Sequence, residues 1–252
     1  MEKDVTAADL EATLNEMQND AQRDVLMRFF KTAPGEYGEG DMFLGLKVPQ
    51  TRAVVKAARG RVPLGEIEKL LYSPWHEARL CGFLLLVEEM KSSMPARKGD
   101  SSQRRAARKE IYDFYVRHAR QANNWDLVDL SCPYIVGPYL RNLPEPDYRV
   151  LYALADSDNL WEQRIAIVST IDLIRCGIYE PTLILVDKLI AHPHDLIHKA
   201  MGWMLRELGK KDLDTMLDYL ERRYDRLPRT TLRYAIERLP ESQRQFWLKR
   251  KR

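Results

Sequence analysis

Apolar residues recur three or four positions apart along most of the chain, which is the spacing of residues on one face of an α-helix. The pattern is strongest near the C-terminus, in the stripes Ile197, Met201, Met204, Leu205, Leu208 and Leu213, Met216, Leu217, Leu220, Tyr224. Near the N-terminus, Thr6 with Asp9 three residues on resembles a capping box that opens a first helix. A second helix is predicted from about Asp20 to Phe30. No stretch alternates with period two, so the pattern predicts an all-α protein.

Three interruptions organise this helical pattern. The segment Pro34–Pro49 is rich in glycine and acids and predicts an ordered loop. A buried helix is predicted from Ser73-Pro74 through Glu89. The polar stretch 91–109 predicts a flexible basic loop between two helices rather than a domain boundary. We therefore expect residues 1–252 to form a single domain.

Helix starts recur along the chain at roughly 35 to 50 residues, a period typical of HEAT-like paired-helix repeats. The aligned starts begin at Trp75, Trp125, Trp161, Ile197 and Thr231. Repeats of this kind stack into a solenoid with one concave face. The predicted fold is therefore a HEAT-like helical-repeat solenoid.

One column of this alignment carries charge, and its members are Arg79, Asp129, Arg164, Lys199 and Arg233. The helix macrodipole disfavours cations near a helix N-terminus, so helix stability does not explain the four basic residues. A shared anionic ligand such as phosphate would explain them. The column thus predicts a basic concave face with a single acid, Asp129.

The stretch 123–140 contains that acid. If Asn123 or Asn124 caps a short helix, Trp125 and Asp129 lie on the same face, four residues apart, while Leu127 and Leu130 lie on the opposite face. A tryptophan directed away from the core has two explanations. Either another helix covers it, or it belongs to a functional site.

Trp203 presents the same choice. It lies off the apolar stripe of its helix, on the side that carries Lys199 and Arg206. An aromatic ring between cations suits a nucleotide or a sugar edge. The alternative is that Trp203 packs against the next repeat.

Composition narrows the classes of function. The 252 residues are 45% hydrophobic and 31% charged, and no run of about 18 apolar residues predicts a membrane span. Residues 1–50 contain 5 Lys/Arg and 10 Asp/Glu, whereas residues 196–252 contain 15 and 8. The basic C-terminal part is a candidate to face phosphate, although solvated helix faces would give the same count.

The acidic N-terminus does not resemble a secretion signal, which indicates a cytoplasmic or nucleoid-associated protein. The three cysteines lack metal-ligand spacing and are predicted to be core residues, so we expect no metal.

Four segments together resemble the AlkD-like DNA alkylation repair glycosylases, a HEAT-repeat family. They are FLGLKVP at Phe43, NNWDLVD at Asn123, DNLWEQRIAI at Asp158 and KAMGWMLREL at Lys199. The resemblance implies hydrolysis of the N-glycosidic bond of cationic N3- or N7-alkylated purines in duplex DNA. It also implies that Asp129, Trp125 and Trp203 are catalytic and that Arg164 contacts DNA. Lys199, Arg206, Arg233 and Arg79 complete the predicted DNA-binding set.

The chemistry suits these residue types. A cationic purine is already a good leaving group, so the remaining task is to stabilise an oxocarbenium-like sugar, which a carboxylate can do without a metal or cofactor. We expect a monomer and no strand cleavage, since no lysine stands out as a Schiff-base nucleophile. The chain departs from the family in having Phe29 where a tyrosine is expected and in its longer acidic loop at 34–41. Two alternatives remain: a HEAT-repeat protein that binds distorted or branched DNA without catalysis, and a protein-binding solenoid.

Overall fold

The structure, a computed structural model, describes residues 4–95 and 99–250. Within these ranges the regular secondary structure is helical, apart from an isolated parallel bridge between Met42 and Trp75. The all-α prediction is confirmed. The chain divides into two compact units, Met1–Ile135 and Val136–Arg252, and the boundary falls inside helix α8.

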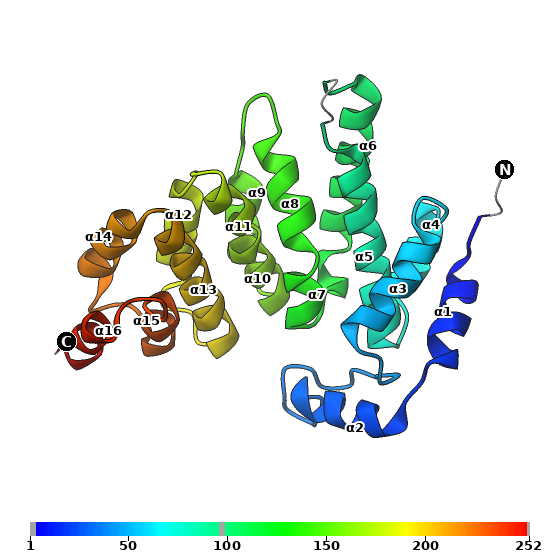
Figure 1. Ribbon diagram of the computed structural model, residues 1–252, viewed down its shortest axis with the longest axis horizontal. Helices are drawn as coiled ribbons and strands as arrows, with labels where there is room; N and C mark the ends of the chain where they lie inside the picture. The colour runs from blue at the N-terminus through cyan, green and yellow to red at the C-terminus, as the bar shows by residue number, and fades with distance from the viewer. Residues whose placement is uncertain (1–3, 96–98, 251–252) are drawn as a thin grey trace. The chain divides into compact units, whose positions relative to one another are not determined.

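The first unit is built around helix α5 (Figure 1). Its helices are α1 (Ala7–Glu16), α2 (Asp20–Phe29), α3 (Val48–Ala58), α4 (Leu64–Leu71), α5 (His76–Ser93), α6 (Ser102–Arg117), the 3₁₀ turn η1 (Ala119–Gln121), α7 (Trp125–Asp129) and the start of α8 (Cys132–Arg141). Helices α3, α4, α6 and α7 pack against α5. Of its 18 residues, 14 are buried, and a helix buried on all sides is the core of its unit.

The predicted N-terminal elements form as expected. Thr6 and Asp9 make the reciprocal capping box at the start of α1, and Asn19 caps α2 through its side chain. The segment between α2 and α3 contains turns and no helix, as its glycines predicted. Gly45 shows why glycine is needed there. Its φ is +91°, and an added Cβ would lie 2.1 Å from the carbonyl oxygen of Asn19.

The prediction of a flexible loop over 91–109 is wrong for most of that stretch. Helix α5 continues to Ser93, and α6 begins at Ser102. Arg108 is buried on α6, where it donates to the carbonyl of Ser93 and pairs with Asp100 at 2.5 Å. These contacts bind the end of one helix to the start of the next. Residues 96–98 lie outside the described residues.

The second unit is built around helix α13 (Figure 1). Its helices are α9 (Arg149–Ala155), α10 (Leu160–Val168), α11 (Thr170–Arg175), α12 (Glu180–Leu189), α13 (Asp195–Lys211), α14 (Leu213–Arg223), α15 (Arg229–Ala235) and α16 (Glu241–Lys249). Helices α10, α11, α12, α14 and α15 pack against α13, and the predicted stripe from Ile197 to Leu208 is buried. At Gly202 a Cβ would lie 2.6 Å from the carbonyl of Thr231, so this glycine allows α13 and α15 to approach closely.

The charged column found in the sequence corresponds to a common helical position. Asp129, Arg164, Lys199 and Arg233 are each the fifth residue of their helices, and Arg79 is the fourth residue of α5. Four of the five residues of the column therefore share one helical position, although the helices begin up to two residues away from the aligned starts. Among the cysteines, Cys81 and Cys132 are buried, but Cys176 is exposed, so its assignment to the core was wrong. No helix in the described part of the chain is both long and apolar enough to cross a membrane.

Candidate active site

Helix α7 has only five residues, fewer than an isolated helix needs to be stable in water. Its neighbours hold it in place. Asn124 is the N-cap, and its Oδ1 accepts a hydrogen bond from the Trp125 backbone N–H at 2.9 Å. After its C-terminus, the hydroxyl of Ser131 donates to the Leu127 carbonyl and lies 2.9 Å from the hydroxyl of Tyr115 on α6. Side-chain hydrogen bonds therefore fix both ends of the segment that carries Trp125 and Asp129.

Trp125 is half-buried in a group of aromatic rings. Phe30 stacks on it, with ring centroids 5.1 Å apart and planes inclined by 23°, and Phe29 meets it edge-on at 5.7 Å. Phe30 also stacks on Phe43 at 5.1 Å. One face of the indole is therefore covered by the end of α2. This partly confirms the expectation that another element packs against Trp125.

A pocket of about 420 Å³ opens beside Trp125 within the first unit. Its walls come from the end of α2, the segment before α3, the start of α5, and α7. Asp129 lines it together with Trp125, as their spacing on one helix face predicted. The full lining is Leu26, Phe29, Phe30, Phe43, Leu46, Lys47, Val48, Pro49, His76, Glu77, Leu80, Trp125, Asp126, Asp129 and Leu130. A half-buried carboxylate thus lies at the edge of an aromatic, largely apolar cavity.

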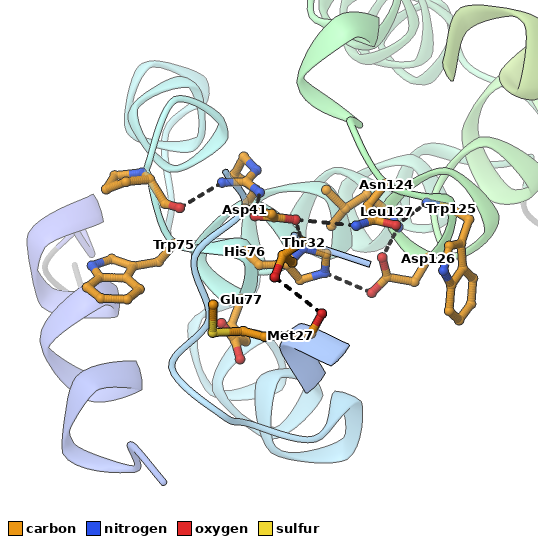
Figure 2. A network of polar contacts seen from close by, with 12 residues as sticks. Met27, Thr32, Asp41, Trp75, His76, Glu77, Asn124, Trp125, Asp126 and Leu127 are labelled. Atoms are coloured by element: carbon orange, nitrogen blue, oxygen red, sulfur yellow. Dashed lines mark hydrogen bonds and ion pairs between the residues drawn. The ribbon is translucent and has the colours of Figure 1, made fainter. Parts of the chain in front are cut away.

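In the wall of this pocket, His76 lies between two buried carboxylates, those of Asp41 and Asp126 (Figure 2). His76 Nδ1 is 2.7 Å from Asp41 Oδ2, and Nε2 is 2.9 Å from Asp126 Oδ2. Arg79 pairs with the other oxygen of Asp41. Burial acts to lower the pKa of His76, but the two carboxylates outweigh it and raise that pKa to about 9. Burial likewise opposes ionisation of Asp41, yet His76 and Arg79 hold its pKa below the ordinary value. The group is therefore two cations that neutralise two carboxylates.

Glu77, the next residue of α5, fixes the pocket wall from below. Its carboxylate is buried and accepts three backbone N–H bonds, from Leu44, Gly45 and Leu46, at 2.8 to 3.0 Å. A single carboxylate thus satisfies three consecutive amides of the loop that precedes α3. This loop forms the pocket wall between Phe43 and Pro49.

Arg79 was predicted to contact DNA, and the structure corrects this. Only 5% of the residue is exposed, and its guanidinium binds Asp41 and the carbonyls of Ser73 and Pro74. Its place in the charged column reflects the packing of α5, because the carboxylate of Asp41 needs a buried counter-charge. Arg79 is therefore not available to contact DNA phosphate.

The cations of the second unit differ in exposure. Arg233 is exposed on α15, and the Lys199 side chain is 41% exposed and pairs with Asp195 at 2.9 Å. The Arg206 side chain is 18% exposed and pairs with Glu237. Arg164 is buried and donates to the Leu196 carbonyl at 2.6 Å. Exposure therefore favours Arg233 and Lys199 as phosphate contacts over Arg164 and Arg206.

Trp203 is half-buried on α13, two residues after Met201 and off the buried stripe of that helix. Its predicted direction away from the stripe is thus consistent with its exposure. No group of three or more His, Cys, Asp or Glu side chains arranged to hold a metal is found among the described residues.

Sequence reasoning missed Asp41, His76 and Glu77. The sequence predicted an ordered, acidic loop at 34–41 and assigned its acids no role, whereas Asp41 is buried. The available signal was the pair His76-Glu77 at the start of a helix whose remaining positions are apolar, because charged residues in such a place need partners. Asp126, on α7 itself, supports that helix. It accepts the Leu127 N–H at 2.9 Å and binds His76.

Comparisons with known proteins agree with this architecture. A family model described as DNA alkylation repair enzyme matches residues 10–239. No curated protein matches the sequence. Among solved structures, a predicted DNA alkylation repair enzyme from Enterococcus faecalis is 17% identical, with a TM-score of 0.64, over 89% of this chain and 97% of that one. At 17% identity, the similarity to this solved structure concerns the fold alone. Because the family match spans most of its length, the chain belongs to the DNA alkylation repair enzyme family.

Proposed function

We propose that the protein is a monofunctional DNA glycosylase that hydrolyses the N-glycosidic bond of cationic N3- and N7-alkylated purines in duplex DNA. The observation that carries the proposal is the placement of Asp129 with Trp125 at an open aromatic pocket, in a chain of the DNA alkylation repair family. Both residues were predicted from sequence to form one site, and both line the same cavity.

The proposed chemistry requires a negative charge and little else. Alkylation at N3 or N7 makes the purine a cation, so it can leave as a neutral base without a proton from the protein. As the bond breaks, positive charge develops on the deoxyribose. The Asp129 carboxylate stabilises that charge and orients the attacking water. An adjacent indole, Trp125, adds the attraction of its π face for a cation.

The aromatic surroundings strengthen this electrostatic role. The pocket beside Asp129 is lined largely by carbon, from Phe29, Phe30, Phe43 and Trp125. A carboxylate that is partly removed from water interacts more strongly with a developing charge than one in bulk solvent. Phe29, which is 60% exposed, replaces the expected tyrosine and leaves this wall without a hydroxyl.

The second unit contributes to the proposal through its predicted residues. From the resemblance we retain Trp203 as a catalytic residue, and from their exposure we retain Lys199 and Arg233 as contacts to the phosphate backbone. Arg206 and Arg164 remain weaker candidates, because both are engaged within the protein. A chromosomal DNA substrate corresponds to activity in the cytoplasm or nucleoid.

Release of base from damaged DNA tests the proposal directly. The protein, in excess over DNA so that each molecule reacts at most once, is incubated with a duplex that contains one 7-methylguanine. Free base is then measured by mass spectrometry. We expect release of 7-methylguanine and an abasic strand that remains intact until it is heated in alkali. Matched undamaged duplex is the control and should release no guanine.

Other outcomes would select another function. If the duplex is bound in a salt-sensitive manner but no base is released, the protein is a DNA-binding member without glycosylase activity. If the duplex is not bound at all, the protein-binding alternative is favoured. Strand cleavage without alkali would contradict the monofunctional mechanism.

A further inference from the structure

The buried charge network beneath the pocket has no part in the proposed reaction, although it lies next to it. Asp41 belongs to the loop between α2 and α3, His76 to the start of α5 and Asp126 to α7. Their side chains are 2%, 2% and 6% exposed. With Arg79, whose side chain is 6% exposed, these groups make four buried charges, which are costly to remove from water unless they are paired.

The geometry defines the protonation of His76. Both of its ring nitrogens face carboxylate oxygens at hydrogen-bond distance. An ionised carboxylate can only accept, so both nitrogens must carry hydrogen, and the ring is an imidazolium. The ring also stacks on Phe43, with centroids 4.3 Å apart. The two carboxylates and Phe43 therefore fix both the positive charge and the orientation of the His76 ring.

From this network two routes lead to α7 (Figure 2). In the first, His76 binds Asp126, the second residue of the helix, while the other oxygen of Asp126 accepts the Leu127 N–H. In the second, the Asn124 side chain approaches Asp41 at 3.4 Å and caps the same helix. A five-residue helix has little rigidity of its own, so these contacts set its position.

We propose that His76 is a positioning residue: held between Asp41 and Asp126, it fixes α7 and thereby sets the direction of the Asp129 carboxylate. The inference rests on the proposed function for the catalytic role of Asp129. It also assigns a role to the loop 34–41, whose last residue supplies one of the two carboxylates. Catalytic carboxylates are effective only when held in the productive geometry, and misplacement by about 1 Å can cost 100-fold in rate.

The other charged groups around His76 do not replace it. Arg79 is committed to Asp41, and the Glu77 carboxylate is committed to three backbone amides. Lys47 and Asp129 line the pocket above. Loss of the imidazolium therefore leaves Asp126 as a buried carboxylate without its cation.

The substitution His76→Gln tests this consequence. Glutamine donates to one carboxylate but turns its carbonyl oxygen toward the other. Asp126 then faces a hydrogen-bond acceptor in place of a donor, so its bond to residue 76 is lost. We expect the single-turnover excision rate to fall by about 10- to 100-fold near neutral pH, with unchanged affinity for undamaged duplex.

The double variant His76→Gln/Asp126→Asn provides the rescue. Asparagine supplies the missing N–H toward the glutamine oxygen, so the excision rate should rise above that of His76→Gln. A histidine that merely fills space does not predict this rescue. The matched control is His118→Gln, because His118 is a buried histidine of the same unit that binds a single carboxylate, that of Glu68. It should not change the excision rate.

A measurement without DNA separates this inference from the proposed function. In protein labelled with ¹⁵N-histidine, His76 should show two protonated ring nitrogens from about pH 6 to about pH 8, where a free histidine loses its proton. The Trp125 indole N–H signal should shift in His76→Gln and not in His118→Gln. A neutral His76 at pH 7, or an unshifted Trp125, would overturn the positioning role even if excision is observed. Absence of excision by the wild type together with both NMR results would reject only the proposed function.

Discussion

Asp129 and Asp126 are three residues apart on one short helix and have different environments. Asp126 is 4% exposed and bound by His76, whereas Asp129 is half-buried and lines the pocket. A carboxylate that acts on a substrate has to face the pocket, as Asp129 does, whereas a carboxylate that stabilises the fold can be buried, as Asp126 is. The residue type alone did not distinguish these roles, but the direction of the side chain does.

Replacement of Asp129 by asparagine keeps the shape of the side chain and removes its charge. We expect Asp129→Asn to lower the single-turnover excision rate by at least about 100-fold, the scale of losing one electrostatic stabiliser of a transition state. Affinity for the lesion-containing duplex should change little, because the ground-state contacts remain. Excision by the variant at the wild-type rate would remove Asp129 from the mechanism.

His76 should also make stability depend on pH. Its pKa is raised from 6.5 to about 9, so the folded state holds a proton that the unfolded chain releases above pH 6.5. The stabilisation is complete below pH 6.5 and is lost as pH rises through about 9, on the order of 3 kcal/mol in total. Urea unfolding at several pH values should show that the free energy of unfolding falls more steeply at alkaline pH for the wild type than for His76→Gln. Parallel curves would contradict a buried imidazolium.

At the scale of elements, the pocket is formed by segments that have little regular structure of their own. The loop before α3 and the short helix α7 are both held by side chains from the first turn of α5. Helix α5 is rigid because it is buried on nearly all sides, so groups attached to its first turn are well placed to hold neighbouring loops. The start of α5 thus positions both walls of the site.

Glu77→Gln tests how strongly that loop depends on α5. One glutamine oxygen cannot accept all three N–H bonds, and its NH₂ group would face an amide donor. We expect unfolding free energy to fall by roughly 2 to 4 kcal/mol, as for loss of hydrogen bonds to a buried charged group. The measurement is the urea midpoint at constant m-value. Glu88→Gln on the same helix, where Glu88 pairs with Lys91 near the surface, is the control and should cost little.

At the scale of the whole molecule, charge is unevenly distributed along the sequence. Residues 196–252 contain 15 Lys/Arg and 8 Asp/Glu, in contrast to the acidic first 50 residues. Binding of a polyanion by exposed cations should release counterions and weaken steeply with salt. A DNA role therefore depends on those cations that the fold leaves accessible.

Removal of one such cation should change how steeply the affinity for duplex DNA depends on salt concentration. We expect Arg233→Ala to reduce the slope of log K against log salt concentration by about 0.9, the value for one phosphate contact in duplex DNA. Fluorescence anisotropy with an undamaged duplex provides the measurement. Arg149→Ala, at an exposed arginine paired with Asp147, is the control and should retain the wild-type slope. An unchanged slope in Arg233→Ala would show that Arg233 does not contact phosphate.

Several helices, and the face that each buries, could be predicted from the sequence alone. Helical periodicity and capping residues are local, so the α1 capping box, the stripe on α13 and the common helical position of Asp129, Arg164, Lys199 and Arg233 could all be read from neighbouring residues. The pairing of Trp125 with Asp129 was predictable for the same reason, because four residues complete about one helical turn.

Which charges are buried could be learned only from the folded chain. Arg79 and Arg233 are both arginines at nearly the same helical position, yet Arg79 neutralises Asp41 in the interior and Arg233 faces solvent. His76 connects Asp41, 35 residues before it, with Asp126, 50 residues after it, and no local pattern records such distances. The physical reason is that burial and charge pairing depend on contacts between distant segments, whereas helix formation depends on residues within one or two turns.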